Sequence, residues 1–552
     1  MRRWNGWGDE ATYLELPDNG QSFLEEKVGS ASPLENASYE QVEANVPASR
    51  LEESDLYTTD KKDRILHSRG QSLPDWLAMK SGEIGVFPDA VSYPESTDDV
   101  RRLLDQAKAN NWVVIPYGGG TSVVGHINPL KDERPIITVD MGRMCRLLDL
   151  DEQSRIATFG AGVPGPLLES QLQAKGYTLG HFPQSFELST LGGWIASRSS
   201  GQQSLKYGRI EQMFAGGKIE TLDGTFDIPT YPASSAGPDI REWFMGSEGR
   251  FGIITEAKIR VTPIAEQEKF FVAFLPSWVN ALNCVRNMVQ AGIPMSMMRL
   301  SNAVETETQL ALAGHEGQIK LLEKFLKFRG AGEGKCMLTF GLTHNKSQNN
   351  LSLSQVKKII SRFDGVYTGT MLGSRWKEKR FLFPYLRETL WERGYAVDTL
   401  ETATDWDNVD YLLSEIENNL RSALGDEGEK VHVFTHLSHF YNQGCSIYTT
   451  YVYRTGDSYE ETLNRWKKLK YSTSELIVNN RGTISHQHGV GLDHAPYMAI
   501  EKGEVSTGLI RHAAEYFDQN KQMNPGKLLV DGDLTATSTA EDSTPESSAQ
   551  SV

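Results

Sequence analysis

The chain has 552 residues, 39% of them hydrophobic and 23% charged, and it carries a formal net charge of −16 at pH 7. This length is enough for two or three domains, each with a core of its own. The acidic balance excludes the broad basic face that nonspecific binding to nucleic acid requires.

The four cysteines, Cys145, Cys284, Cys336 and Cys445, lie far apart, and none belongs to a Cys-x-x-Cys pair. This spacing argues against zinc ribbons, iron–sulfur clusters and a disulfide framework, so we expect reduced core thiols. The chain has no run of about 18 apolar residues that would span a membrane and no apolar signal-peptide core at its start. It ends without the peroxisomal Ser-Lys-Leu address, and we expect a cytoplasmic protein.

The first 80 residues combine a tryptophan-rich start with a polar, acidic stretch of little periodicity. This predicts a tethered arm with one or two short helices. From residue 88 the pattern becomes regular. Residues 90–93 predict a short strand, and Ser96 or Thr97 is placed to cap a helix whose apolar face recurs at helical spacing from Val100 to Ala107.

A buried strand at residues 112–115 leads into Pro116-Tyr-Gly-Gly-Gly-Thr-Ser122. Three consecutive glycines cannot form a strand interior, since they pack no side chain and cost backbone entropy. They predict a loop on which backbone N–H groups converge, with the hydroxyls of Thr121 and Ser122 at its rim. Such a loop suits a phosphate or pyrophosphate, although a lone Gly-Gly-Gly is also compatible with an ordinary tight turn.

Two further strands are expected at residues 136–140 and 155–159, and the second runs into Gly160-Ala-Gly-Val-Pro-Gly165. This segment matches the G-x-G-x-x-G pattern of a dinucleotide-binding Rossmann unit, with a helix beginning near Pro166. We interpret the match as coincidental. Pro164 stiffens the turn where a pyrophosphate must approach, and an earlier phosphate loop already precedes it.

Glycine-rich turns recur at residues 181–208 and 246–254, where a Ser/Thr-capped helix start can receive a phosphate. Residues 266–480 instead hold long amphipathic helices and strands, which predicts a second domain. Residues 481–530 return to glycine-rich sequence. Residues 531–552 have little apolar surface to bury, which predicts a disordered tail.

These motifs together resemble the FAD domain of the vanillyl-alcohol-oxidase-like flavoproteins, and within that superfamily the chain is similar to the alkyl-dihydroxyacetonephosphate synthases. The resemblance rests on the segments 3–8, 116–122, 180–194, 248–256, 298–302, 385–387, 401–406 and 485–491. It implies an α+β fold, with a two-subdomain FAD-binding domain of the vanillyl-alcohol-oxidase type and an α+β cap domain over the substrate. We assign residues 81–265 to the FAD-binding domain, 266–480 to the cap and 481–530 to a segment that returns to the active site.

The resemblance also implies where FAD lies. The pyrophosphate belongs on the glycine loop, and three later segments match the family's other flavin contacts. The implied flavin-contacting residues are Pro116, Tyr117, Gly118, Gly119, Gly120, Thr121, Ser122, Gln184, Ser185, Phe186, Glu187, Leu188, Ser189, Thr190, Ser197, Arg198, Ser199, Ser200, Glu248, Gly249, Arg250, Phe251, Gly252, Ile253 and Ile254. We expect noncovalent FAD, because Gly120 stands where histidyl-linked members of the superfamily carry their histidine.

The family's reaction exchanges the acyl chain of acyl-dihydroxyacetonephosphate for a fatty alcohol and is redox-neutral overall. Residue by residue, the resemblance implies that Tyr448 is the acid/base near the reacting carbon and that Arg387 holds an anionic group of the substrate, for which a planar guanidinium is well suited. The other implied catalytic groups are Arg299, His181, His486 and His488. The alternatives are surface ion pairs for the arginines and core packing for Tyr448.

The synthases carry three consecutive histidines where this chain has His486-Gln487-His488. If residues 483–488 are extended, His486 and His488 share one face and Gln487 lies on the other. Flavin-linked 2-hydroxy-acid dehydrogenases have a similar segment, so such a dehydrogenase or oxidase is the alternative function. A His-x-His pair can also bind a metal, but the sequence places no third ligand nearby, and we predict no metal site.

A noncatalytic flavin-binding or scaffold protein is a third hypothesis, which the retained tyrosine, histidines and arginines disfavour. We expect a small-molecule lipid or hydroxy-acid substrate, peripheral membrane contact for lipid access, a homodimer and no nucleic-acid partner.

Overall fold

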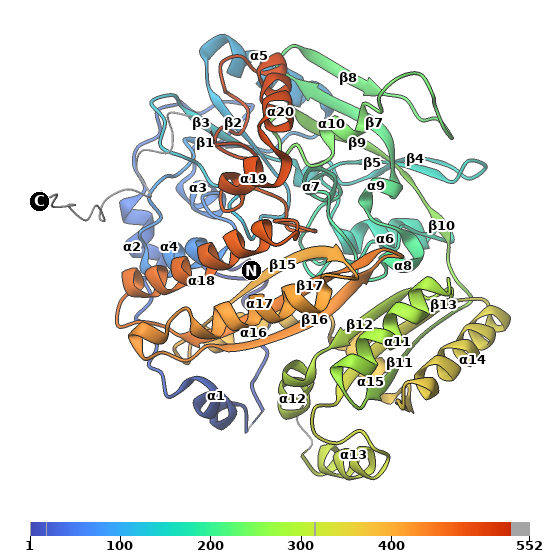
Figure 1. Ribbon diagram of the computed structural model, residues 1–552. Helices are drawn as coiled ribbons and strands as arrows, with labels where there is room; N and C mark the ends of the chain where they lie inside the picture. The colour runs from blue at the N-terminus through green and yellow to red at the C-terminus, as the bar shows by residue number, and fades with distance from the viewer. Residues whose placement is uncertain (1, 18, 314–315, 531–552) are drawn as a thin grey trace, which may run out of the picture.

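The computed structural model describes residues 2–17, 19–313 and 316–530 (Figure 1). The predicted tail, residues 531–552, lies outside the described residues. Within the described ranges, no helix combines the length and the apolar character that crossing a membrane requires.

The N-terminal 80 residues form four helices, not the one or two that we predicted. They are α1 (Gly20–Val28), α2 (Tyr39–Asn45), α3 (Lys61–Leu66) and α4 (Leu73–Ser81). Three of the four begin at a side chain that caps the helix, namely Ser38, Asp60 and Ser72. These local caps, and not a long apolar stripe, define the helices, which is why periodicity alone missed them.

A small parallel sheet carries the glycine loop. Its strand order is β1 (Ala90–Ser92), β3 (Ile136–Asp140) and β2 (Val113–Tyr117). Helix α5 (Thr97–Asn110) starts at a capping box on Ser96 and buries Val100, Leu103, Leu104 and Ala107. The predicted strand, cap and helix face are confirmed, and β2 runs two residues further than predicted, so that Tyr117 is its last residue.

The second subdomain is a five-stranded antiparallel sheet. Its order is β4 (Leu147–Asp151), β5 (Ile156–Gly160), β9 (Ile253–Arg260), β7 (Phe214–Thr221) and β8 (Gly224–Ile228). Because β5 pairs antiparallel with both of its neighbours, the glycine segment that follows it does not belong to a parallel Rossmann unit. The helices of this part are α6 (Gly165–Gln173), α7 (Leu191–Ser197), α8 (Ser204–Tyr207), α9 (Ile210–Met213) and α10 (Arg241–Phe244), and β6 (Tyr177–Thr178) pairs with β10 (Thr262–Pro263).

A seven-stranded antiparallel sheet dominates the rest of the chain. Its order is β14 (Val366–Gly369), β11 (Gln267–Leu275), β13 (Cys336–His344), β12 (Met297–Ser301), β16 (His432–Phe440), β17 (Gly444–Arg454) and β15 (Tyr395–Asp405). Figure 1 shows this sheet below the three-stranded and five-stranded sheets, with α11, α14 and α17 packed against it. The helices of this half are α11 (Trp278–Gln290), α12 (Ala303–Ala311), α13 (Glu316–Phe328), α14 (Lys346–Arg362), α15 (Met371–Lys379), α16 (Leu386–Trp391), α17 (Val409–Ser422) and α18 (Tyr459–Asn479).

The C-terminal segment connects the two halves. After α18 the chain passes through α19 (Met498–Lys502) and α20 (Glu504–Phe517), and Met523 then pairs with Val114 beside β2. The largest core cluster also crosses the boundary, because Trp76 of α4, Trp391 of α16 and Trp466 of α18 are all buried in it. The two halves are therefore joined both by the C-terminal segment and by a shared core, and these contacts fix the walls of any cavity between them.

Candidate active site

One cavity of about 920 Å³ lies where the glycine-rich half faces the seven-stranded sheet. The glycine loop, α7 and the turn before β9 form one wall, and strands β12, β15, β16 and β17 contribute the other. Apolar side chains line another part of it, among them Leu16, Phe23, Leu24, Leu310, Leu372, Leu382 and Val452. The cavity thus joins a polar, glycine-lined region to an apolar one.

The glycine loop lies directly against the segment that precedes α7. A Cβ on Gly119 would stand 1.8 Å from the backbone oxygen of Leu188, and one on Gly118 would stand 2.3 Å from Thr190 Oγ1. In the part of the chain that the structure describes, no acceptor contacts the backbone N–H groups of Gly118, Gly119 and Gly120. The loop therefore presents free donors to the cavity, which is the chemistry that a pyrophosphate requires. These residues fit FAD.

Most of the residues predicted to contact the flavin line this cavity. They are Pro116, Tyr117, Gly118, Gly119, Gly120, Thr121, Ser122, Gln184, Ser185, Ser189, Thr190, Ser197, Ser199, Ser200, Glu248, Gly249, Gly252, Ile253 and Ile254. Six do not line it, namely Phe186, Glu187, Leu188, Arg198, Arg250 and Phe251. Their side chains have other contacts: Phe186 stacks on Phe381, and Arg198 pairs with Glu211 and Glu242.

Glu248 anchors the flavin wall to the C-terminal segment. Its carboxylate accepts the backbone N–H groups of Val490 at 2.6 Å and Gly491 at 2.8 Å, and it lies 3.0 Å from His126 Nε2. His126 in turn lies 2.8 Å from Ser122 at the rim of the glycine loop. Glu248 thereby fixes the loop's position through its neighbours.

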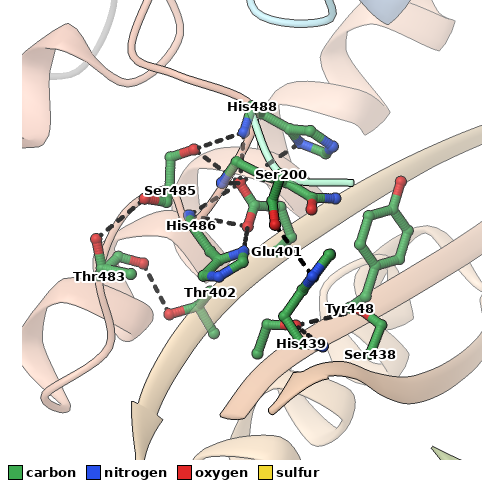
Figure 2. Close-up of polar contacts among 12 residues, drawn as sticks. Ser200, Glu401, Thr402, Ser438, His439, Tyr448, Thr483, Ser485, His486 and His488 are labelled. Atoms are coloured by element: carbon green, nitrogen blue, oxygen red, sulfur yellow. Dashed lines mark hydrogen bonds and ion pairs between the residues drawn. The ribbon is translucent and has the colours of Figure 1, made fainter. Parts of the chain in front are cut away.

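A buried carboxylate that we did not predict, Glu401 of β15, organises the histidine segment. It accepts the backbone N–H groups of His486, Gln487 and His488 at 2.8–3.0 Å and the hydroxyl of Ser485 at 2.7 Å. Burial raises the pKa of this carboxyl, but His488 and these donors outweigh burial and hold it below its ordinary value. Figure 2 shows the carboxylate inside the turn.

The condition that residues 483–488 are extended is therefore not met, because a chain that wraps around one carboxylate must bend. Its consequence for the side chains is also corrected: Gln487 and His488 line the cavity, whereas His486 lies behind the wall. Nε2 of His486 lies 2.6 Å from the hydroxyl of Tyr441, and its ring is tilted against that of His439 with the centroids 4.8 Å apart. Among the described residues, no cluster of three or more His, Cys, Asp or Glu side chains is suited to a metal ion.

Tyr448 of β17 lines the cavity beside His488, with their ring centroids 5.7 Å apart. Its hydroxyl donates to Thr399 Oγ1 at 3.3 Å, and burial raises the pKa of Tyr448 to about 12. On its other face it stacks on His436, 4.9 Å away. A protonated phenol and an imidazole therefore stand next to one another on the cavity wall.

Arg387 lines the cavity with its guanidinium 4.4 Å from the ring of Trp76. Its Nη1 donates to the backbone oxygen of Gln71 at 2.5 Å, while Nε and Nη2 are buried with no hydrogen-bond partner among the described residues. Burial lowers the pKa of Arg387, and the carboxylates of Asp398 and Asp75 oppose that shift. Arg387 is not a surface ion pair, and it retains N–H donors for an anion.

Arg299 also lines the cavity, but it has an internal partner. Its Nη2 donates to Glu305 Oε1 at 2.6 Å, and the same oxygen lies 3.1 Å from His436 Nδ1. Burial opposes ionisation of Glu305, yet Arg299 and His436 together lower its pKa. This chain of contacts fixes the imidazole on which Tyr448 stacks.

His181 does not join the other predicted catalytic residues. It is fully buried, its ring lies tilted against Trp194 with the centroids 4.7 Å apart, and its Nε2 lies 3.1 Å from Ser199 Oγ. Burial lowers its pKa to about 3, so the ring is neutral. It supports the flavin wall from behind through Ser199, which lines the cavity.

Comparison with known proteins places this site in a family. The family model described as "FAD binding domain" matches residues 88–226, and that described as "FAD linked oxidases, C-terminal domain" matches residues 264–528. The alkyldihydroxyacetonephosphate synthase of Trypanosoma brucei brucei is 30% identical over 96% of this chain and 92% of its own length. The chain belongs to the alkyldihydroxyacetonephosphate synthase family.

Other comparisons agree with this membership. The alkyldihydroxyacetonephosphate synthase of Dictyostelium discoideum is 29% identical over 96% of the chain. A solved alkyldihydroxyacetonephosphate synthase superposes with a TM-score of 0.81 at 27% identity, covering 95% of this chain and 98% of that one. At 13% identity, p-cresol methylhydroxylase shares the fold alone, with a TM-score of 0.66. The predicted fold class, an FAD-binding domain with an α+β cap, is confirmed.

Three residues that the structure places in or beside the cavity wall escaped prediction, namely Glu401, His436 and His439. Glu401 stands in a motif that we matched to the family, but nothing in the sequence couples it to a loop more than 80 residues away. His436 and His439 are three residues apart, which on a regular strand means opposite faces. A register irregularity between Leu437 and Phe440 brings both to the cavity, and the sequence carries no clear signal of it.

Proposed function

We propose that this protein is an FAD-dependent enzyme that exchanges the acyl chain of acyl-dihydroxyacetonephosphate for a fatty alcohol, a step of ether-lipid synthesis. The observation that carries the proposal is the composition of the cavity. Its lining combines the N–H donors of the glycine loop, the side chains of Tyr448, His488 and Arg387, and a set of apolar side chains. A phosphate, a reacting carbonyl compound and a long alkyl chain each find a matching environment there.

FAD is proposed to bind along the glycine loop, the start of α7 and the turn before β9, where the cavity-lining residues fit it. When bound, it accepts and returns an electron pair within each turnover. We propose that it is noncovalent, since Gly120 has no side chain to form a linkage. Heat with acid should release the yellow colour into solution, and flavin that precipitates with the protein would contradict this.

The proposed roles of the chain's own residues follow from their contacts. Arg387 holds the anionic group of the substrate with its unpartnered N–H groups. Tyr448 and His488 move the proton at the carbon next to the carbonyl, because they are adjacent and face the cavity. The Arg299–Glu305–His436 contacts and the Glu401 turn hold these groups in place.

The decisive experiment supplies acyl-dihydroxyacetonephosphate and a long-chain alcohol anaerobically, without an electron acceptor. Ether product is expected, because the exchange is redox-neutral. A flavin-linked hydroxy-acid dehydrogenase is the alternative, and the glycolate oxidase subunit GlcD of Bacillus subtilis is a relative at 24% identity over 80% of the chain. Rapid anaerobic bleaching by lactate or glycolate, with no ether formed, would favour that alternative.

Peripheral contact with a lipid surface is proposed for α13, which follows the cavity-lining residues at the end of α12. Leu321, Phe325 and Phe328 are exposed at helical spacing, with 70%, 43% and 87% of their surfaces accessible, beside exposed lysines. Gln318 of this helix accepts a hydrogen bond from Arg375, which lines the cavity. Sedimentation with anionic lipid vesicles should occur, and Phe328→Glu should reduce it.

A further inference from the structure

The cavity contains a second imidazole that faces the position of Gln487. His439 of β16 lines the cavity, and its backbone N–H donates to Ser446 Oγ at 3.1 Å. Its Nδ1 lies 3.1 Å from Ser200 Oγ and 3.0 Å from Ser204 Oγ, as Figure 2 shows for Ser200. The side chain of Gln487 lies beside the same ring. Because Nδ1 lies against two serines, Nε2 is the ring nitrogen on the side of Gln487, and an incoming hydroxyl would take the place of that amide at Nε2.

We propose that His439 is a catalytic residue of this protein, one that accepts the hydroxyl proton of the incoming fatty alcohol, a role that Gln487 cannot perform. An amide side chain neither gains nor loses a proton near neutral pH. His439 lines the same cavity, next to Gln487. This inference rests on the proposed function.

The step balances as a substitution at one carbon. The O–H bond of the alcohol breaks and its oxygen bonds to the substrate carbon. The bond from that carbon to the ester oxygen breaks, and the acyl chain leaves as a carboxylate that keeps the electron pair. The proton of the alcohol passes to the imidazole, so no external oxidant or reductant is needed.

The surroundings keep the free imidazole neutral but make it a weak base, so the proposed role requires the charge of the bound substrate to raise its pKa. Burial, with Arg209, lowers the pKa of His439 to about 3, while Glu401 and Gln487 act in the opposite direction. The other titratable neighbours are His436 on the same strand and His486, whose ring is tilted against that of His439. Substrate phosphate and the leaving carboxylate bring negative charge into the same cavity, and nearby negative charge favours the imidazolium as the proton arrives.

The serines give His439 a fixed orientation relative to the flavin wall. Ser200 belongs to the segment predicted to contact FAD and lines the cavity, and Ser204 begins α8. Hydrogen bonds to a ring nitrogen select the tautomer and hold the ring plane. A base that is prealigned in this way loses little entropy when the alcohol enters.

A histidine–glutamine exchange tests the proposal. Flavin-loaded wild type, His439→Gln, Gln487→His and the double variant are compared for ether formation over a range of alcohol concentrations. His344→Gln, at the end of β13 and outside the cavity lining, serves as the matched control. Flavin content, the melting temperature and the Kd of a long-chain alcohol, followed by the flavin spectrum, are measured alongside.

His439→Gln is expected to lower kcat by about a hundredfold or more, the usual contribution of a general base, with the Kd of the alcohol nearly unchanged. The double variant should regain at least about tenfold, because Gln487→His returns an imidazole to the same part of the cavity. A purely structural role for His439 would not be rescued in this way. The control should match the wild type.

Wild-type kcat in His439→Gln would overturn the proposal, and so would a double variant that recovers nothing. If His439→Gln loses its flavin, His439→Asn is measured in its place, and loss of flavin in both assigns His439 to the flavin wall and overturns the catalytic role. A wild type that makes no ether would instead contradict the proposed function, so the two failures are distinguishable.

Discussion

The turn at residues 485–488, which wraps around the Glu401 carboxylate, offers the sharpest test of what fixes the position of the histidine segment. In Glu401→Gln only one acceptor oxygen remains, which can still serve Ser485 and the backbone N–H groups that now contact Oε1 at 3.0 Å. The new amide NH2 then faces the His486 N–H, which loses its 2.8 Å contact to Oε2 and keeps only the 3.0 Å contact to Oε1, so the amide itself is the buried donor without an acceptor. An unsatisfied buried donor costs about 1–3 kcal/mol, and hydrogen bonds to a neutral acceptor are weaker than those to a carboxylate.

Removing the buried charge relieves part of its desolvation cost, so a net loss of about 2–3 kcal/mol in local stability is expected. This corresponds to about 30- to 150-fold faster amide exchange at residues 486–488, at 1.4 kcal/mol for each factor of ten. Hydrogen exchange followed by mass spectrometry on a peptide that spans this turn measures it directly. The ether-forming kcat should fall as well, because His488 loses its fixed position.

The matched control is Glu152→Gln, an exposed carboxylate in the turn between β4 and β5. It should change neither the exchange of the 486–488 amides nor kcat. Unchanged exchange in Glu401→Gln would show that the carboxylate does not hold the turn, and the reasoning would fail.

Four further outcomes are expected. Arg387→Ala should weaken substrate binding about fiftyfold through loss of a charge-assisted hydrogen bond, with flavin content intact and Arg393→Ala as the control; unchanged substrate affinity would remove Arg387 from the site. Tyr448→Phe should keep its flavin yet lose about 10²–10⁴ in kcat, and full activity would exclude the phenol as acid/base. Gly119→Ala should yield protein with little flavin, since its Cβ would meet Leu188 O at 1.8 Å; a fully loaded variant would contradict the packing. The pKa of Glu305 lies below its ordinary value of 4.5, so the carboxylate stabilises the fold above that pH and less as acid protonates it. The difference in melting temperature between wild type and Glu305→Gln should be constant above about pH 4.5 and narrow below it, and a difference that persists in stronger acid would argue against this ion pair.

The sequence alone was enough to predict several local elements of the structure, because each depends on the chemistry of neighbouring residues. The helix after Ser96 follows from its capping box and its apolar spacing, and the loop at Gly118–Gly120 follows from residues that cannot form a strand interior. These features depend on neighbours only a few positions away. Ordered motif matches along nearly the whole chain were likewise enough for the family, since they do not depend on knowing how the motifs meet in space.

Only the tertiary structure decided which histidines of the candidate site face the cavity. Residues 486–488 would be free to form an extended segment, but the Glu401 carboxylate, brought in by β15, bends them, so that Gln487 and not His486 joins His488 at the cavity. His439 reaches the cavity because β16 departs from regular pairing near Leu437, and His181 is excluded from it by packing on Trp194. Each outcome depends on a contact between distant segments, and alternation along a strand describes only the backbone's local period.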